Sequence, residues 1–306
     1  MRTRGCARRA GRASLFDMPR LTRRRCLALT VLAVLALLAA GLLGARRSGA
    51  QGAGPRGGEL PIFDGHIHYS APDWTVHPPA EIFAILDRAG VRRALVSSTP
   101  DDGTLKLYDK DPRRIVPMLR PYRTRDDMGG WWQDPSIIPY LEERLRRKVH
   151  RGIGEFHLYG AQARTPVIKR ITELAVRENL ILQAHSDDTT ILELFAVEPR
   201  LRIIWAHAGM SSSAQAVGAM VDRYPNLWVE LSLRNGDVAP GGTLDPEWRA
   251  LFLRHPDRFL VGTDTWMTSR WQALPGSAAE QRRYLSQLPR EVAEKIAFRN
   301  ADRLFP

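Results

Sequence analysis

Short apolar runs recur along residues 57–306 at a nearly constant interval. The mean interval between their starting points is (259 − 62)/7, or about 28 residues, close to the length of one strand–helix–strand unit. Runs such as 202–206 (RIIWA) are almost continuously apolar, as parallel strands buried on both faces are. Eight such units in 250 residues predict an α/β protein with a (β/α)8 TIM barrel. The predicted strands begin near Ile62, Arg92, Ile115, Gly152, Leu180, Arg202, Leu227 and Phe259.

Helical periodicity separates most of these runs. In 166–178 the apolar residues fall at helical spacing, whereas 121–135 is rich in Trp, Asp and Gly and predicts a long loop after the third strand. The alternative architecture is an open doubly wound sheet, which would normally carry a phosphate-binding glycine loop after its first strand. Here the first strand ends in histidines instead. Helices are predicted at 79–89, 136–149, 166–178, 189–198, 213–224, 246–255 and 278–298.

The basic charge of the chain is confined to its N-terminal part. The whole sequence has a net charge of +12, but residues 1–56 hold twelve Arg and one acid, which leaves 33 − 32 = +1 for the remainder. A body without a net basic field does not attract phosphates. The charge distribution therefore argues against a nucleic-acid-binding surface.

Residues 1–50 have the pattern of an export signal. Three arginines at 23–25 precede the apolar run 26–45, and the small residues at 48–50 resemble a cleavage site. The arginines also resemble a twin-arginine signal, and Met18 is a second candidate start. We expect export to the periplasm or the extracellular space by the export machinery, a linker at 51–59, and the barrel at 60–306. The alternative is a membrane anchor formed by 26–45, which is about long enough to span a bilayer.

The first predicted strand ends in two histidines at alternate positions. His66 and His68 face the same side of an extended strand and lie at the carboxyl end of the barrel, where active sites of this fold are found. Both cysteines, Cys6 and Cys26, lie in the N-terminal segment, so a metal site in the body must use His, Asp and Glu. Two converging imidazoles suit a divalent metal such as zinc.

Other predicted strands also end in residues that can bind metal or transfer protons. Buried imidazoles and carboxylates are unfavourable unless they have a partner, so their concentration at one edge predicts a functional cluster. The residues are Glu155 and His157 after the fourth run, His185 after the fifth, His207 after the sixth and Asp264 after the eighth.

These motifs, taken in order, resemble those of the amidohydrolase superfamily. The most similar branch is the amidohydrolase 2 group, which includes lactonases, other hydrolases and aminocarboxymuconate-semialdehyde-type decarboxylases. The resemblance covers essentially all of residues 60–306 and implies a metal-dependent (β/α)8 enzyme. It rests on DGHIH (64–68), GIGEFH (152–157), QAHSD (183–187), WAHAG (205–209), VGTD (261–264) and the closing NADRLF (300–305).

The resemblance implies a role for each matching position. His66 and His68 match the strand-one metal ligands, and His185 matches the strand-five ligand. His207 matches a histidine that binds a second metal in two-metal members and often acts as an acid or base in one-metal members. Asp264 matches the aspartate that binds metal and accepts the proton of the attacking water.

Glu155 is a departure from the two-metal pattern. It stands where two-metal members often carry a carboxylated lysine, and the nearest lysine, Lys148, precedes the strand. We therefore expect one zinc ion, with manganese or another transition metal as an alternative and a second metal left open. Glu155 is a candidate ligand, bridge or hydrogen-bond partner of a ligand histidine.

The expected chemistry is hydrolysis of a small ester, lactone or amide. Zinc held by imidazoles makes hydroxide available near neutral pH, Asp264 can take the proton, and His207 can polarise the carbonyl or protonate the leaving group. The same residues could serve a metal-dependent, non-oxidative decarboxylase of an unsaturated carboxylic acid. A non-catalytic ligand-binding barrel is the third alternative, because a fold does not determine a function.

Four further residues are candidates for binding a small carbonyl or carboxylate substrate. Arg120 ends the third predicted strand and could clamp a carboxylate, or form an ion pair at the barrel rim. By strand alternation, His157 lies on the same face as Glu155 and could contact the substrate. Alternatively, it could form a hydrogen bond to a ligand residue. Trp131 and Trp266 could shape an apolar pocket, or serve ordinary packing.

Overall fold

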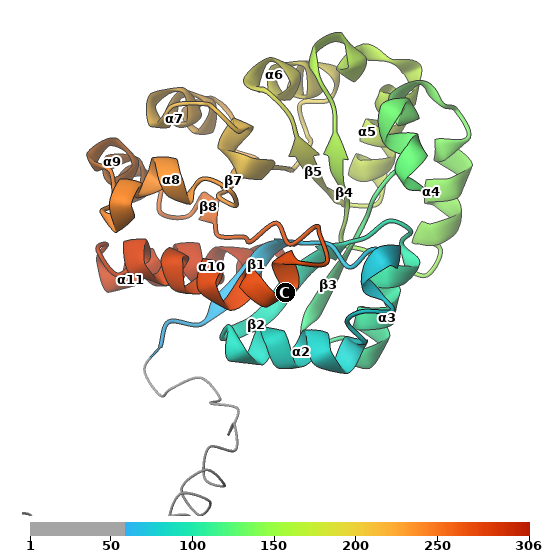
Figure 1. Ribbon diagram of the computed structural model, residues 1–306. Coiled ribbons are helices and arrows are strands. Elements are labelled where there is room, and N and C mark those ends of the chain that lie inside the picture. Colours follow the sequence, from blue (N-terminus) through green and yellow to red (C-terminus); the bar gives the residue numbers. More distant parts are fainter. Residues whose placement is uncertain (1–58) are drawn as a thin grey trace, which may run out of the picture. The chain divides into compact units, whose positions relative to one another are not determined.

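The computed structural model describes residues 59–306. Its eight strands form one sheet in which each strand pairs in parallel with the next one in the chain. Helices surround the strands on the outside (Figure 1). The strands are β1 (Ile62–Ile67), β2 (Val91–Ser97), β3 (Ile115–Leu119), β4 (Gly152–His157), β5 (Ile181–His185), β6 (Ile203–Trp205), β7 (Leu227–Glu230) and β8 (Phe259–Leu260).

The last strand returns to the first. Gly65 N donates to Val261 O at 2.8 Å, and His68 N donates to Thr265 O at 2.9 Å. A parallel bridge between Ile67 and Thr265 continues this contact beyond the short β8. The predicted (β/α)8 barrel is thus confirmed, and the open doubly wound sheet is wrong.

The connecting helices begin at residues whose side chains favour a helix start. In α5 the Thr165 hydroxyl accepts from Ile168 N, Pro166 occupies the first turn, and the buried residues follow a helical period. The helices are α2 (Pro79–Arg88), α3 (Asp102–Lys110), α4 (Ile137–Leu145), α5 (Pro166–Arg177), α6 (Asp188–Val197), α7 (Ala214–Arg223), α8 (Asn235–Val238), α9 (Pro246–Arg254), α10 (Arg270–Leu285), α11 (Arg290–Glu294) and α12 (Asn300–Leu304).

The observed helices differ from the predicted ones at several places, because α8, α12 and the first part of α10 lie outside the predicted ranges. The range 278–298 is not one helix: α10 ends at Leu285, and a new helix starts after Pro289, whose ring and missing N–H interrupt the hydrogen-bond ladder. Helix α3 was not predicted, because 102–110 holds only two buried large apolar residues, Leu105 and Leu107. The predicted loop 121–135 is confirmed in outline, since it contains only short 3-10 turns.

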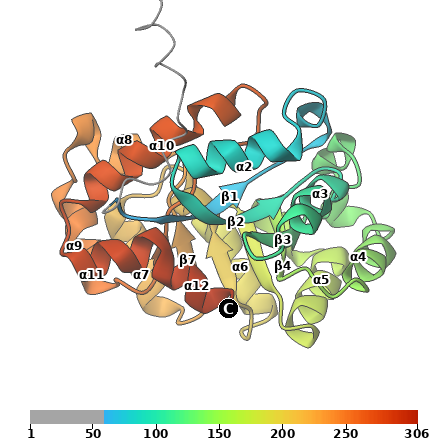
Figure 2. The ribbon, with the colours of Figure 1, turned by 90° about the horizontal axis from the view of Figure 1, so that it is seen from below.

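The end of the chain closes the bottom of the barrel. Phe305 stacks against Phe63 of β1 with 6.3 Å between the ring centroids, within a cluster of inward-facing strand residues. Asn300 Nδ2 donates to the carbonyl oxygens of Pro256 and Phe259, both at 2.9 Å. Figure 2 shows α12 and the C-terminus beneath the strands. The amino end of the barrel is therefore filled with apolar side chains.

None of the helices within 59–306 combines the length and hydropathy that a bilayer span needs. The predicted export signal at 1–50 and the alternative anchor at 26–45 lie outside the described residues, as does nearly all of the 51–59 linker.

Candidate active site

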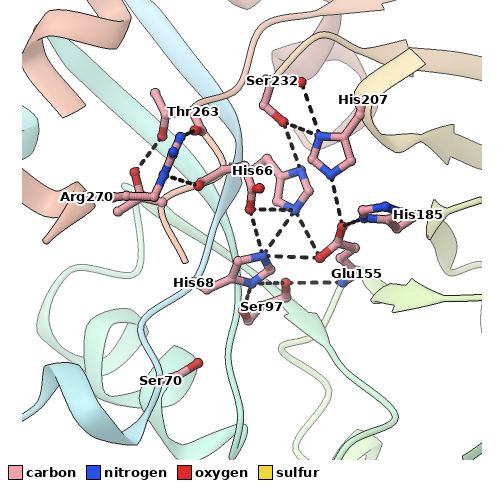
Figure 3. Close-up of polar contacts among 12 residues, drawn as sticks. His66, His68, Ser70, Ser97, Glu155, His185, His207, Ser232, Thr263 and Arg270 are labelled. Carbon is pink, nitrogen blue, oxygen red and sulfur yellow. Dashed lines mark hydrogen bonds and ion pairs between the residues drawn. The ribbon is translucent and has the colours of Figure 1, made fainter. Parts of the chain in front are cut away.

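The predicted ligands converge at the carboxyl end of the barrel (Figure 3). His66 and His68 come from the end of β1, Glu155 from β4, and His185 from β5. His207 follows β6 and Asp264 follows β8. Both have positive φ angles, 56° for His207 and 45° for Asp264. Such angles are uncommon for residues other than glycine and cluster at functional sites.

Donor atoms of four side chains gather at this point. His66 Nε2 lies 3.1 Å from His68 Nε2, and both lie 3.3 Å from Glu155 Oε2. These three separations are close to the edges of about 3.3–3.4 Å that zinc–ligand bonds of about 2.0–2.1 Å would give, and the three residues form a group that could hold a metal ion. Asp264 Oδ1 lies 3.3 Å from His68 Nε2 and 3.6 Å from His66 Nε2, so it adjoins this group as a fourth donor.

The Nδ1 atoms of His66 and His68 form hydrogen bonds that leave the Nε2 atom of each ring facing the centre of the cluster. His68 Nδ1 donates to Ser97 O, because a carbonyl oxygen can only accept. His66 Nδ1 faces Glu230 Oε2 at 2.9 Å, which likewise places its proton on Nδ1. When both rings are neutral, two Nε2 lone pairs face each other and two carboxylates. A bound proton or a cation removes this repulsion, so the donor set fits a divalent metal.

Glu155 connects these ligands to a second pair of histidines. Its Oε1 lies 2.9 Å from His185 Nδ1 and 3.2 Å from His207 Nε2, on the side opposite to the contacts of Oε2. Arg120 Nη2 lies 3.3 Å from Glu155 Oε2, and Arg120 Nε donates to the Glu155 carbonyl at 2.9 Å. The carboxylate thus contacts both histidine pairs, and Arg120, which lines the cavity, forms a buried ion pair with it.

The charged groups of the cluster shift the pKa values of their neighbours. Burial opposes ionisation of Glu155, but His66 and hydrogen bonds from His185 and His207 lower the pKa of Glu155 well below its usual value. Burial likewise opposes ionisation of Asp264, yet His66 and His68 lower its pKa to about 2. For His66 itself, Glu155 and Asp264 outweigh burial and raise the pKa well above its usual value. The carboxylates are ionised and attract positive charge to the centre.

Glu230 and Ser232 belong to the site and were not predicted. Fully buried Glu230 contacts His66 Nδ1, and Ser232 Oγ donates to Glu230 Oε2 at 2.9 Å. His207 Nδ1 lies 2.9 Å from Ser232 Oγ and 3.2 Å from Ser232 O. Both residues therefore orient ligand histidines. Glu230 ends β7, so the strand-end rule that selected the other residues would have found it.

His157 lies beside the second histidine pair. Its ring stacks on that of His185 with 4.3 Å between centroids, and its Nδ1 lies 3.2 Å from the Tyr122 hydroxyl. That hydroxyl accepts from His157 N at 2.7 Å and can donate its own hydrogen to Nδ1, an arrangement that places the ring proton on Nε2. Burial lowers the pKa of His157 to about 4. His157 is thus a neutral hydrogen-bond donor at the cavity.

A cavity of about 750 Å³ lies against several of the candidate ligands. His68, Glu155, His157, His185 and Asp264 line it, together with Arg120 and Trp266.

Trp131 does not line this cavity, contrary to the sequence-based expectation. It is buried, packs on Phe156 and Tyr122, and donates from Nε1 to His157 O at 3.0 Å. Its loop folds back into the core, so its contact with the site passes through the backbone of His157.

Several solved structures share this architecture. A TatD homologue from Escherichia coli K12 has a TM-score of 0.56 at 16% identity, covering 80% of this chain and 97% of its own. A candidate 2-pyrone-4,6-dicarboxylic acid hydrolase from Pseudomonas putida has a TM-score of 0.54 at 18% identity, covering 80% and 97%. Amidohydrolase 2 from Bifidobacterium longum subsp. infantis has a TM-score of 0.50 at 16% identity, covering 80% and 98%. Identities this low show a common fold alone.

The family of this chain is identified by a match of its sequence to a family model. No curated protein matches the chain. The family model described as Amidohydrolase matches residues 63–306, which include the whole barrel and every candidate ligand at the strand ends. With its ordered histidines and carboxylates at the carboxyl end of a (β/α)8 barrel, the chain belongs to the amidohydrolase family.

Proposed function

We propose that this protein is a metal-dependent hydrolase of a small ester, lactone or amide. The observation that carries the proposal is the four-donor set of His66, His68, Glu155 and Asp264, in which the donor atoms of Glu155 and Asp264 each lie 3.3–3.6 Å from both histidine Nε2 atoms. These residues would hold a divalent cation, most simply zinc. A cation in such a site supplies Lewis acidity toward a carbonyl and makes water acidic near neutral pH.

The side chains around the centre provide the remaining functions. Asp264 is ionised and lines the cavity, so it can accept the proton of the attacking water and return it to the leaving group. His157 offers an Nε2–H to the carbonyl oxygen of a substrate. Arg120 orients Glu155 through its two contacts.

His185 and His207 support a second, more open centre. With Glu155 Oε1 they offer three donors, the number typical of a catalytic zinc site that keeps one position for water or substrate. We propose that the four-donor set would hold the first cation, and that His185, His207 and Glu155 would hold a second. His207 then serves as a ligand, and its predicted acid–base role falls to Asp264.

Metal content and turnover, measured on the same preparations, test the proposal. Elemental analysis of the full-length chain should give two equivalents, one in His185→Asn, and loss of the first site in Asp264→Asn. Hydrolysis across a panel of lactones, esters and amides should fall by about 10²- to 10⁴-fold in Asp264→Asn. His255→Asn is the matched control, because His255 contacts Asp222 outside the cluster.

Two results would contradict parts of this proposal. Undiminished hydrolysis by folded Asp264→Asn would remove the proposed base. Release of carbon dioxide from an unsaturated acid without net incorporation of water would replace hydrolysis by decarboxylation. One equivalent of metal, unaffected by His185→Asn, would reduce the centre to the four-donor site.

A further inference from the structure

The exposed apolar side chains of the described residues gather at one end of the barrel. Seven large apolar residues of 59–306 are exposed, and six follow the carboxyl ends of strands. Only Leu253, on α9, lies elsewhere. Single exposed apolar residues are ordinary, but a cluster around a cavity marks a binding surface. The six are Val76, Tyr159, Met210, Leu233, Trp266 and Met267.

Two of these six also have unfavourable backbone conformations. Leu233 is 44% exposed at φ 62°, and Met210 is 43% exposed at φ 62°. Glycine or asparagine adopts such angles more readily, and a polar side chain would suit the exposure better. Neither position is explained by packing, because much of each side chain faces solvent. An unfavourable conformation at such a position indicates function.

Three of the six form one wall of the cavity above the candidate metal site. Leu233 follows β7, and Trp266 and Met267 follow β8. Met128 from the turn after β3 and Pro72 from the turn after β1 also line the cavity. Apolar side chains from four separate loops therefore line the cavity, together with the candidate ligands and with polar side chains such as Ser70, Asp73 and Arg125.

The size of the cavity shows how large an occupant these walls can hold. Pockets of about 300–1,000 Å³ enclose drug-sized molecules, so 750 Å³ greatly exceeds the volume of a single small lactone ring. A substrate whose carbonyl lies at the ligands would leave the apolar walls in contact with water unless the molecule extended along them.

We propose that the substrate carries an extended apolar group, such as an alkyl chain of several carbons, that lies against Leu233, Trp266 and Met267. This inference rests on the proposed function for the position of the carbonyl. The exposed apolar rim is then the outer part of the substrate site, and the metal ligands are its inner end.

Binding of methyl ketones measures this apolar contribution without any bond to hydrolyse. We would titrate 2-pentanone, 2-heptanone and 2-nonanone calorimetrically into the full-length chain after removal of metal. Full burial of a methylene contributes about four-fold in affinity, so a wall that is partly open should give about two- to four-fold per methylene.

Three variants assign the effect to the wall. Leu233→Asn and Trp266→Ala should each reduce the gain from 2-pentanone to 2-nonanone by about three- to ten-fold. Leu253→Asn, which changes an exposed leucine outside the cavity, should leave the gain unchanged. Leu233→Asn should also raise the thermal midpoint slightly, because asparagine tolerates a positive φ.

Each failure has a distinct meaning. An affinity independent of chain length would overturn the inference, and so would equal losses in Leu233→Asn and Leu253→Asn. Self-association seen by sedimentation, abolished by Leu233→Asn and accompanied by a flat ketone series, would instead make the rim an interface between copies. A length-dependent ketone series with no hydrolysis in any panel would contradict only the proposed function, whereas hydrolysis with a flat series would contradict only this inference.

Discussion

The two ends of the barrel differ in which kinds of side chain are buried and which are exposed. At the carboxyl end, polar groups are buried, apolar groups are exposed, and five of the seven non-glycine residues with positive φ follow β6, β7 or β8. At the amino end, Phe63 and Phe305 are buried against each other. Charged groups there pair at the surface, as Arg93 does with Asp302 at 3.0 Å.

This contrast separates stability from chemistry within one fold. Buried apolar surface stabilises the amino end, whereas the carboxyl end buries carboxylates and imidazoles that need bound protons or a cation between them. Substitutions at the two ends should therefore have different signatures: loss of metal and activity at one end, and loss of folding free energy at the other.

Glu155→Gln should have the largest effect, on function alone. Glutamine keeps the shape and the carbonyl contact of Arg120 but removes the charge that both histidine pairs share. We expect loss of bound metal and a fall in turnover of about 10²- to 10⁴-fold. Circular dichroism should remain unchanged. A variant that keeps its full metal content would show that Glu155 is not a ligand.

Phe305→Ala should be the strongest test of the amino end. Removing this buried ring from the cluster around Phe63 should lower the free energy of unfolding by about 3 kcal/mol. Below the unfolding transition, metal content should stay normal. Urea unfolding monitored by fluorescence measures the change. If metal content fell in the folded variant, the two ends would not be independent.

Glu230→Gln should produce a smaller effect at the carboxyl end. Without the charge behind His66 Nδ1, the imidazole loses basicity and orientation, so metal affinity should fall by about 10- to 100-fold. Competition with a chelator of known affinity measures this. Glu230→Asp should recover little, because the shorter side chain withdraws from His66. Unchanged affinity would assign Glu230 a purely structural role.

The pH dependence of stability should reverse on metal removal. Burial opposes protonation of His66 and His207, but neighbouring carboxylates raise both pKa values above 6.5. The metal-free protein therefore binds these protons more tightly when folded, and it should lose stability as pH rises from about 6.5 through the raised pKa values. Metal competes with the same protons, so the loaded protein should gain stability over that range. Thermal midpoints measured with and without chelator would test this, and parallel curves would contradict it.

The sequence predicted the strand positions well because short apolar runs recur at a nearly constant interval. All eight predicted starts lie within one residue of the observed ones, from Ile62 to Phe259. Helix α3 was missed because its burial depends on neighbours rather than on its own periodicity.

Residue types at strand ends located the cluster, but not its hydrogen bonds. That Glu155 turns one oxygen to each histidine pair, and that Trp131 folds away from the cavity, depends on side-chain rotation and loop path. A linear pattern does not encode either property, so alternation along β4 could place Glu155 and His157 on one face without distinguishing their roles.

The return of β8 to β1 also dictates when the protein can first hold its metal. His66 and Asp264 are 198 positions apart in the chain, and the four-donor set needs both. During synthesis, a nascent chain can form local strand–helix units early, but loop-closure entropy delays contacts between distant segments. The donor set is complete only after Asp264 has emerged, and the bottom of the barrel only after Phe305 has. Stable metal uptake is therefore expected only late in synthesis, after Asp264 and the residues that close the barrel have emerged.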